Sequence, residues 1–406
     1  MLQPGADNLQ ADQRPRLDRR PRHWIGRLSL SSFRNYVTAE IEAGPEPVVL
    51  VGPNGVGKTN LLEAVSLLAP GHGLKHAPYE ELVRKGGPGD WAISALVHGR
   101  DGPLRIGTAL RRAAEGSERR SGRIVHIDGE RRAGPAALGG CVHMVWLVPA
   151  MDSLFTGPAS ERRRFLDRLI VSFDRDYASR LSRFERAMRQ RNRLLENGLD
   201  ERVLLEGLEI EMAETGVAIA ASRREAVSAL TAAIAERRMR DPTSAFPWVG
   251  LDLVGSLEAQ LTERPAVEVE DGYRHALARS RERDRAAKRA LEGPHRSDLH
   301  VWHGPKGTPA KVSSTGEQKA LLMGLVLAHA ELLAERRQHP APILLLDEVA
   351  AHLDDRRRSA LFADVLHLGM QVWMTGTDRS AFEALFGRAL FADIDDGRIK
   401  VGRRPL

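Results

Sequence analysis

The chain has 406 residues, which exceeds the size of one ordinary domain, and a hydrophobic fraction of 42% is enough for a substantial core. Lys and Arg number 60 against 54 Asp and Glu, and the net charge of +6 permits a nucleic-acid partner without establishing one. The single cysteine, Cys141, excludes an intrachain disulfide, and the sequence lacks an apolar run of about 18 residues, so we expect a cytoplasmic protein without a membrane span.

The N-terminal residues, 1–24, are polar and rich in Pro and Arg. They lack the apolar segment of a secretory signal, and we expect a disordered basic tail. Two short strands are predicted at 25–30 and 36–41, and a third, apolar strand at 48–51. Helical spacing of apolar residues predicts a helix over 61–68. The residues between the third strand and this helix therefore form a strand-to-helix loop.

That loop carries a complete phosphate-binding pattern, G-x-x-x-x-G-K-[ST], in the segment Gly52-Pro53-Asn54-Gly55-Val56-Gly57-Lys58-Thr59. The glycines let backbone N–H groups turn toward the phosphates of ATP, Lys58 adds a positive charge, and the Thr59 hydroxyl can ligate Mg²⁺. A chance glycine-rich turn is the alternative. Because the strand before and the helix after are the context that a phosphate loop requires, we predict ATP and Mg²⁺ as cofactors.

Further strands are predicted at 92–97, 104–110 and 141–148, and 124–127 begins a hairpin. Residues 25–158 therefore indicate the N-terminal part of an α/β head.

The character of the chain changes after Pro158, where 159–292 is mostly helical and strongly charged. An apolar stripe at helical spacing covers 165–188, and a second helix over 203–239 is expected to pack against it as an antiparallel pair. A β-like run at 248–254 and a basic helix at 273–291 complete the segment. We predict a mainly helical, basic arm inserted into the head.

Positive charge is concentrated at the start of this arm. Residues 161–193 contain eleven Arg and five Asp or Glu. On charge grounds the candidates for contact with DNA phosphates are Arg162, Arg163, Arg164, Arg183, Arg186, Arg189 and Arg193. The alternative for each is a solvated helix face or a pair with a nearby acid.

The α/β pattern returns over 293–406, with a helix at 321–333 and strands at 343–346, 372–374, 391–394 and 399–401. The first of these strands ends in two carboxylates. Asp347 is predicted to hold Mg²⁺, and Glu348 to act as the general base toward the attacking water, with Lys58 as its catalytic partner. A helix N-terminus that favours acids is the alternative. Asp354 lies where the D-loop of an ABC-type ATPase would be.

The segment Ser314-Thr315-Gly316-Glu317 precedes the predicted helix at 321–333. A hydroxyl and backbone N–H groups at a helix N-terminus form an anion site, and in one chain this site has no phosphate if the nucleotide lies on Lys58. Ser314 and Gly316 would then cap the γ-phosphate held by a second copy, which predicts an ATP-dependent homodimer. An ordinary capping box, in which Ser314 and Glu317 satisfy one another's N–H groups, is the alternative.

With these motifs in hand, the chain resembles the RecF family of bacterial recombination mediators, within the SMC-like ABC ATPases, from residue 25 to the C-terminus. The resemblance includes the phosphate loop with Asn60 and the segments Phe33-Arg34-Asn35-Tyr36, Arg163-Arg164-Phe165-Leu166-Asp167, Gly293-Pro294-His295-Arg296 and Ser314-Thr315-Gly316-Glu317-Gln318-Lys319. It implies an ATP-binding dimer that binds gapped, single-stranded or junction-containing DNA and acts with RecR and RecO in the loading of RecA. Thr375-Gly376-Thr377 lacks the histidine that transporter ATPases carry as a γ-phosphate sensor, and a Q-loop glutamine is not evident near Val148-Pro149.

Three other functions fit parts of the sequence. A transporter ATPase subunit would share the split site, but the large helical insertion and the missing histidine argue against it. A metabolic phosphotransferase would have the phosphate loop but no need of an anion site in a second copy. A scaffold that binds ATP without turnover would tolerate loss of Glu348.

Overall fold

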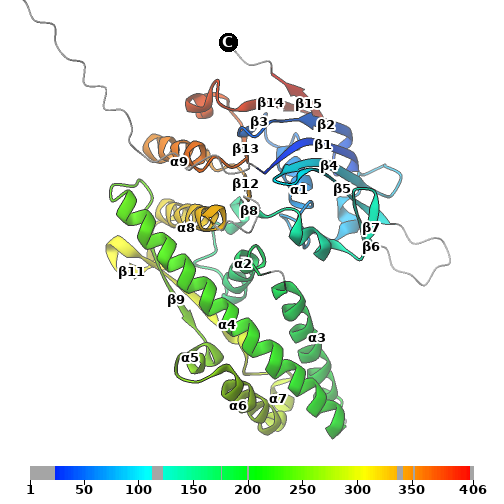
Figure 1. The fold of residues 1–406 in the computed structure, drawn as a ribbon, viewed down its shortest axis with the longest axis vertical. Helices are drawn as coiled ribbons and strands as arrows, with labels where there is room; N and C mark the ends of the chain where they lie inside the picture. Colours follow the sequence, from blue (N-terminus) through cyan, green and yellow to red (C-terminus); the bar gives the residue numbers. More distant parts are fainter. Residues whose placement is uncertain are drawn as a thin grey trace, which may run out of the picture.

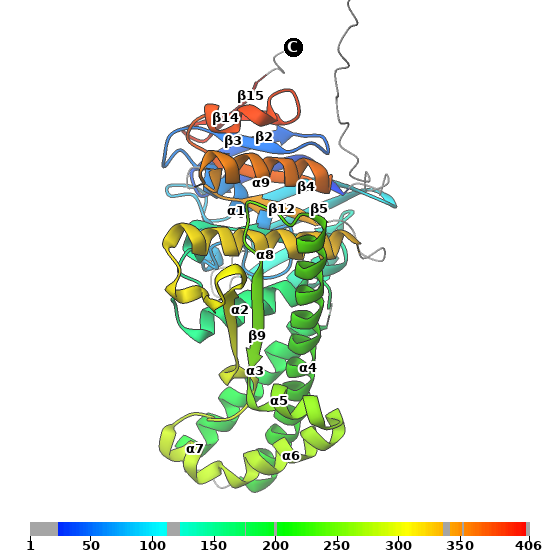
Figure 2. The same cartoon turned by 90° about the vertical axis from the view of Figure 1, so that its left-hand side faces the viewer.

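The computed structural model describes residues 23–111, 122–174, 176–198, 201–335, 342–350 and 353–402. In Figure 1 a head, in which blue and cyan N-terminal segments lie beside orange and red C-terminal ones, is joined to an arm of green and yellow helices. Figure 2 shows the long helix α4 (Arg202–Arg240) running from the head along the arm. Except for its last two residues, the expected N-terminal tail lies outside the described residues.

The head is organised around a six-stranded sheet in which five strands are parallel and the edge strand β15 is antiparallel. Its order is β15 (Arg398–Val401), β14 (Leu390–Asp395), β3 (Val48–Val51), β13 (Val372–Gly376), β12 (Ile343–Leu346) and β8 (Met144–Leu147). Strands buried on both faces read as continuous apolar runs, which is why four of them were predicted almost to the residue. The strand predicted at 141–148 is shorter, because a 3₁₀ turn over Pro135–Gly140 continues into Cys141.

Helices cover both faces of this sheet. Helix α1 (Lys58–Ser66) packs with Val48 and Leu50 on one face. On the other face α8 (Thr315–Glu335) and α9 (Asp355–Leu368) pack with Val49 and Val51. Alternate residues of β3 therefore serve two separate cores, as the period of two in a strand requires.

A second, antiparallel six-stranded sheet belongs to the same core as α1. Its order is β2 (Tyr36–Glu42), β1 (Trp24–Phe33), β4 (Ala92–Gly99), β5 (Gly102–Arg111), β6 (Gly122–Ile127) and β7 (Glu130–Arg132). The predicted strands and the hairpin of β6 and β7 are confirmed. Strand β1 is longer than predicted, and the connection to β2 is a two-residue turn at Arg34 and Asn35.

The arm begins with α2 (Ala159–Val171) and α3 (Tyr177–Glu196), followed by α4, against which α3 packs. The apolar stripe predicted as continuous over 165–188 is divided between α2 and α3. Asp174 explains the break, because its carboxylate accepts the Asp176 N–H at 3.2 Å and binds Arg180 at 2.5 Å, which starts a new helix.

The second half of the arm differs more from the prediction. The single helix expected at 273–291 is wrong: α6 (Ala266–Arg279) and α7 (Arg281–Ala287) meet at Ser280, and Lys288 ends α7 in the left-handed conformation at φ 54°. Helix α5 (Ser256–Glu263) was not predicted. Strand β9 (Val249–Val254) pairs with β10 (Asp298–His303), also unpredicted, and β10 pairs with β11 (Thr308–Pro309).

Two buried ion-pair networks fix the arm helices. Arg223 of α4 donates to Asp167 of α2 at 2.8 and 3.0 Å and also contacts the Pro294 carbonyl. Farther along the arm, Arg191 of α3 binds Glu209 at 3.0 Å and Asp284 at 2.8 Å. The two sequence segments that bound the arm, 163–167 and 293–296, are therefore joined through one arginine of α4.

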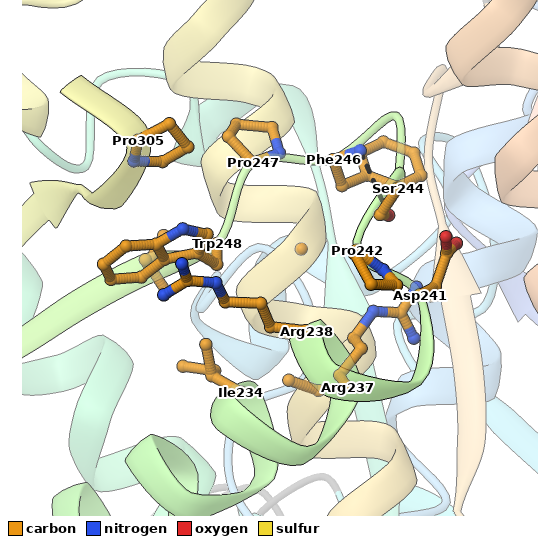
Figure 3. A pocket seen from close by; sticks show the side chains of 13 residues that line it. Ile234, Arg237, Arg238, Asp241, Pro242, Ser244, Phe246, Pro247, Trp248 and Pro305 are labelled. Carbon is orange, nitrogen blue, oxygen red and sulfur yellow. Dashed lines mark hydrogen bonds between the residues drawn. The ribbon is translucent and has the colours of Figure 1, made fainter.

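A third contact connects the arm to the head. Arg237, near the end of α4, binds Glu331 of α8 and, at 2.5 Å, Asp364 of α9. Beside it lies a cavity of about 200 Å³, in which Arg238 stacks over the Trp248 ring with 4.5 Å from guanidinium carbon to ring centre (Figure 3). The helix that extends farthest into the arm is thus attached to two helices of the head.

Candidate functional site

The phosphate loop lies at the carboxyl end of β3, and Lys58 is the first residue of α1. Gly57 caps this helix at φ 111°, and a Cβ at this position would lie 2.4 Å from Asn35 Nδ2, so only glycine fits. The Lys58 ammonium group donates to the carbonyls of Gly52 at 2.7 Å and Pro53 at 2.8 Å. Its side chain is buried, and burial lowers the pKa of Lys58.

The turn between β1 and β2 and the first residue of β2 form hydrogen bonds to carbonyls of the phosphate loop. Asn35 Nδ2 donates to the Val56 carbonyl and the Tyr36 hydroxyl to the Gly57 carbonyl, each at 2.9 Å. Asn60, the residue after the loop, donates to Asn35 Oδ1 at 2.9 Å. Sequence reasoning noted Phe33-Arg34-Asn35-Tyr36 only as a point of resemblance. Its position in a turn just before the loop was the available signal for this role.

The acidic pair lies at the carboxyl end of β12, two strands from β3. The Thr59 hydroxyl lies 3.0 Å from both carboxylate oxygens of Asp347, so the loop and the acid are in direct contact. Asp347 is 5% exposed, and burial raises the pKa of its carboxyl group. Glu348 has a left-handed backbone at φ 53°, which is uncommon for a residue other than glycine.

Strand β13 lies between the strands that end in these two segments. The Thr375 hydroxyl accepts the Glu348 N–H and donates to Asp347 Oδ1, each at 2.8 Å. The carbonyl of the next residue, Gly376, accepts the Gly52 N–H at 3.3 Å. Sequence reasoning found no histidine here and assigned no role. A hydroxyl residue at the end of a strand beside the acidic pair was the signal it missed.

The segment predicted to act on a second copy is exposed. Ser314, Thr315 and Gly316 lie at the start of α8 on the surface. Ser314 and Glu317 form the reciprocal capping box, with N–H to side-chain oxygen distances of 3.0 and 3.4 Å. Lys306 binds Glu317, and together with the cap it lowers the pKa of that carboxyl to about 2.

Asp354 caps α9 by accepting the Arg357 N–H at 2.8 Å, and its side chain is 59% exposed. The same arginine donates to the Gly316 carbonyl at 3.4 Å, so the start of α8 and the start of α9 are linked. Within the described residues, no hydrogen bond or ion pair joins Ser314, Gly316 or Asp354 to the phosphate loop of the same chain. Both the capping box and an anion site for another copy are compatible with this geometry.

The region searched for a Q-loop borders a small cavity beside the acidic pair. Val148 and Pro149 line it together with Asp347 and Glu348. Asp152 lies at the same cavity and binds Lys319 of α8 at 2.8 Å.

The seven arginines proposed for DNA contact have different environments. Arg162 binds Asp298 at 2.7 Å, Arg163 donates to the Ser297 carbonyl at 2.6 Å, and Arg183 binds Glu211 at 3.1 Å. Arg189 is paired with Glu185 of its own helix. Among the described residues, no hydrogen bond or ion pair involves the exposed side chains of Arg164, Arg186 and Arg193.

These groups can bind a phosphate chain and a hard cation. The Lys58 ammonium group lies against the loop carbonyls of Gly52 and Pro53, and the Thr59 hydroxyl and the Asp347 carboxylate are oxygen ligands of the type that Mg²⁺ prefers. Among the described residues no group of three or more His, Cys, Asp or Glu is placed to hold a metal ion.

A parallel sheet with a phosphate loop after β3 and an acidic pair after β12 defines the α/β head of an ABC-type P-loop ATPase, here with a mainly helical inserted arm. The family model of the RecF/RecN/SMC N terminal domain matches residues 24–385. The DNA replication and repair protein RecF of Mesorhizobium japonicum is 51% identical over 92% of this chain and 97% of that protein. The RecF protein of Brucella suis biovar 1 is 46% identical over 94% and 98%. This chain belongs to the RecF family of SMC-like ATPases.

Solved structures agree with the fold. The structure of the recombination mediator protein RecF-ATPrS in the RecFOR pathway has a TM-score of 0.82 at 23% identity, over 95% of this chain and 99% of that one. The SMC head bound to the C-winged helix domain of ScpA has a TM-score of 0.52 at 15% identity, over 93% and 97%. No helix in the described part of the chain is long and apolar enough to cross a membrane.

Proposed function

We propose that this protein is an ATP-dependent, DNA-binding switch in DNA replication and repair. The contact of the Thr59 hydroxyl with both oxygens of Asp347 carries the proposal, because it brings the phosphate loop and the acidic pair into one site. The relatives that share about half of its residues are named for DNA replication and repair, and the similar solved structures are titled as RecF with ATP or ATPrS.

In this proposal the loop from Gly52 to Asn60 binds ATP. Lys58 exchanges its two carbonyl partners for phosphate oxygens, and the negative charge of a bound phosphate opposes the lowering of the Lys58 pKa by burial. Thr59 and Asp347 hold Mg²⁺, which neutralises charge on the phosphates. Glu348 orients the attacking water and accepts its proton. Turnover is slow, as suits a switch.

Two copies close around two nucleotides. Ser314 and Gly316 lie on the surface, and the Ser314 hydroxyl, which accepts the Glu317 N–H in the capping box, still has a proton to donate to the γ-phosphate held by the other copy. Asp354, one hydrogen-bonded link away through Arg357, lies next to them. ATP that binds only the closed pair shifts the monomer–dimer equilibrium by mass action. Hydrolysis then releases the pair.

The dimer binds gapped, single-stranded or duplex DNA through phosphates, with Arg164, Arg186 and Arg193 as the candidates whose charges are uncompensated among the described residues. Arg162, Arg163 and Arg183 contribute less, since carboxylates or carbonyls of the arm already hold them. With RecR and RecO as partners, the protein aids the loading of RecA at gaps and the SOS response. A cytoplasmic location is part of the same proposal.

The test is ATP-dependent binding to a gapped duplex at fixed salt, with wild type compared with Lys58→Arg and Ser314→Arg. ATP should strengthen wild-type binding, and both substitutions should remove this gain. Ser256→Arg is the matched control, because Ser256 is an exposed serine at the start of the arm helix α5. Analytical ultracentrifugation of the same proteins should find an ATP-dependent dimer only for wild type and the control. DNA binding that is indifferent to ATP and to both site variants would contradict the proposal.

A further inference from the structure

Thr375 occupies the central position of the candidate site. It lies at the carboxyl end of β13, which pairs with β12 on one side and β3 on the other. Its side chain is 1% exposed. The following residue, Gly376, contacts Gly52 through its backbone, so this strand end lies between the phosphate loop and the acidic pair.

The hydroxyl of Thr375 makes two hydrogen bonds of different direction. It accepts the N–H of Glu348 and donates to Oδ1 of Asp347, each at 2.8 Å. A hydroxyl has one proton to donate, and here that proton goes to the carboxylate. The Thr375 side chain thus holds both the backbone of Glu348 and the carboxylate of Asp347.

The backbone of Glu348 needs such a restraint. Its φ of 53° lies in the left-handed region, which is unfavourable for a residue with a side chain and persists only where the surroundings hold it. Because the direction of the Cα–Cβ bond follows from the backbone dihedrals, the restraint also fixes the origin of the Glu348 side chain. A relaxed backbone would aim the carboxylate elsewhere.

We propose that Thr375 is a positioning residue for hydrolysis, which holds Glu348 in its left-handed conformation and orients Asp347 without contacting the nucleotide. The inference rests on the proposed function, in which Glu348 is the general base. It gives a role to a strand end that lacks the histidine found in transporter ATPases.

The inference predicts a split between binding and turnover. Thr375→Val keeps the shape of the side chain and removes only the hydroxyl, so ATP affinity should stay within about twofold of wild type while kcat falls at least about tenfold. Thr375→Ser restores the hydroxyl and should recover most of kcat. A residue that merely fills space would give the opposite order, because Val preserves volume and Ser does not.

The experiment measures equilibrium ATP binding and steady-state hydrolysis on the full-length protein for both variants. Thr262→Val is the matched control, since Thr262 is an exposed threonine of the arm helix α5, away from the candidate site. It should leave kcat unchanged. Unfolding curves in urea, together with the recovery by Thr375→Ser, separate a loss of positioning from a loss of folding.

Three results would overturn the inference: an unchanged kcat in Thr375→Val, a loss of ATP affinity that matches the loss of kcat, or a Thr375→Ser variant no better than Thr375→Val. Glu348→Gln distinguishes this failure from failure of the proposed function. If Glu348→Gln abolishes hydrolysis and Thr375→Val does not reduce it, only the role of Thr375 is wrong. If Glu348→Gln hydrolyses ATP normally, the proposed general base is wrong as well.

Discussion

Buried charges have different partners in the candidate site of the head and in the arm. In the arm, Arg223 and Arg191 face carboxylates at 2.8 to 3.0 Å. In the head, Lys58 is equally buried but is held by backbone carbonyls, and Asp347 is held by the hydroxyls of Thr59 and Thr375. Both kinds of site satisfy the rule that buried polar groups find partners. At the candidate site the partners are neutral, whereas the arm, like the pair of Arg34 and Glu63 at 2.8 Å elsewhere in the head, uses opposite charge.

The difference indicates what each region is for. A buried ion pair whose charges compensate one another resists the loss of either partner, because the remaining charge would be stranded. A buried charge with neutral partners has its charged form weakened, as the lowered pKa of Lys58 and the raised pKa of Asp347 indicate. A ligand of opposite charge stabilises the charged form of such a group when it binds. The buried pairs of the arm are therefore complete without a ligand, and the candidate site of the head is prepared for one.

The largest effect is expected from breaking an arm pair. Arg223→Met leaves Asp167 buried without its cation, and the free energy of unfolding should fall by about 3 to 5 kcal/mol. Urea unfolding measures the change. Arg186→Met is the control, since Arg186 is exposed and should change stability by less than about 0.5 kcal/mol. Equal effects of the two variants would contradict the comparison.

Removal of the Lys58 charge should have little effect on stability and a large effect on ATP affinity. Lys58→Met eliminates a buried charge that has no carboxylate within ion-pair distance among the described residues, so unfolding without nucleotide should change by no more than about 1 kcal/mol. ATP affinity should fall by a factor of about 100 or more, because the ammonium group meets the phosphates. Calorimetric titration with ATP measures the loss. A strong destabilisation of the nucleotide-free protein would mean that Lys58 is structural.

The pair of Arg162 and Asp298 gives a pH-dependent version of the test. Burial raises the pKa of Asp298, but the hydrogen bond and charge of Arg162 outweigh burial and hold the pKa below its usual 3.8. A lowered carboxyl pKa stabilises the folded state above 3.8, and this stabilisation disappears as the pH falls through the folded value. Asp298→Asn should therefore cost about 1 kcal/mol at pH 7, discounted for partial exposure, and progressively less below pH 4. A loss of unfolding free energy in Asp298→Asn that does not change with pH would contradict this prediction.

The smallest effect on the monomer is expected at Ser314. Ser314→Ala removes a cap of α8 and should cost about 0.5 to 1 kcal/mol in unfolding free energy. Ser182→Ala is the control, because Ser182 is an exposed serine within α3 that does not cap the helix. If Ser314 serves only as a cap, ATP-dependent dimerisation of Ser314→Ala should equal that of wild type. Sedimentation of both variants with ATP decides this.

The sequence predicts those parts of the molecule in which the local pattern of apolar residues and glycines matches the burial and backbone conformation of the folded protein. The phosphate loop, β3, β12 and the single long helix α4 follow from apolar runs, glycine positions and period. The division of 165–188 and of 273–291 into separate helices depends on Asp174 and Ser280, whose side chains act on nearby backbone and are ambiguous without it. Strand β10 alternates only weakly in polarity, and its existence depends on β9, which lies 44 residues or more earlier in its pairing.

Within the candidate site, individual residues could be named from the sequence, but their relative placement could not. Lys58, Asp347 and Glu348 follow from motifs, whereas the roles of Asn35 and Thr375 depend on which strand lies next to which. The Arg-rich segment shows the same limit, since composition identified seven arginines alike, and contacts separate Arg162 from Arg164. The charge of a segment can be counted from the sequence, but whether each charge is paired depends on which residues lie next to it in the folded protein.

The position of β3 in the middle of the central sheet has a consequence for synthesis. Its two neighbours, β13 and β14, begin only at Val372 and Leu390. At 5 to 20 residues per second, a ribosome that has finished β3 needs roughly 17 to 69 s to make both of them. Throughout that interval Val48 to Val51 has neither of its pairing partners, and the whole arm, residues 159–292, is made before β13 begins. The nucleotide site must therefore be among the last parts of the nascent chain to form, and ATP cannot assist any earlier step.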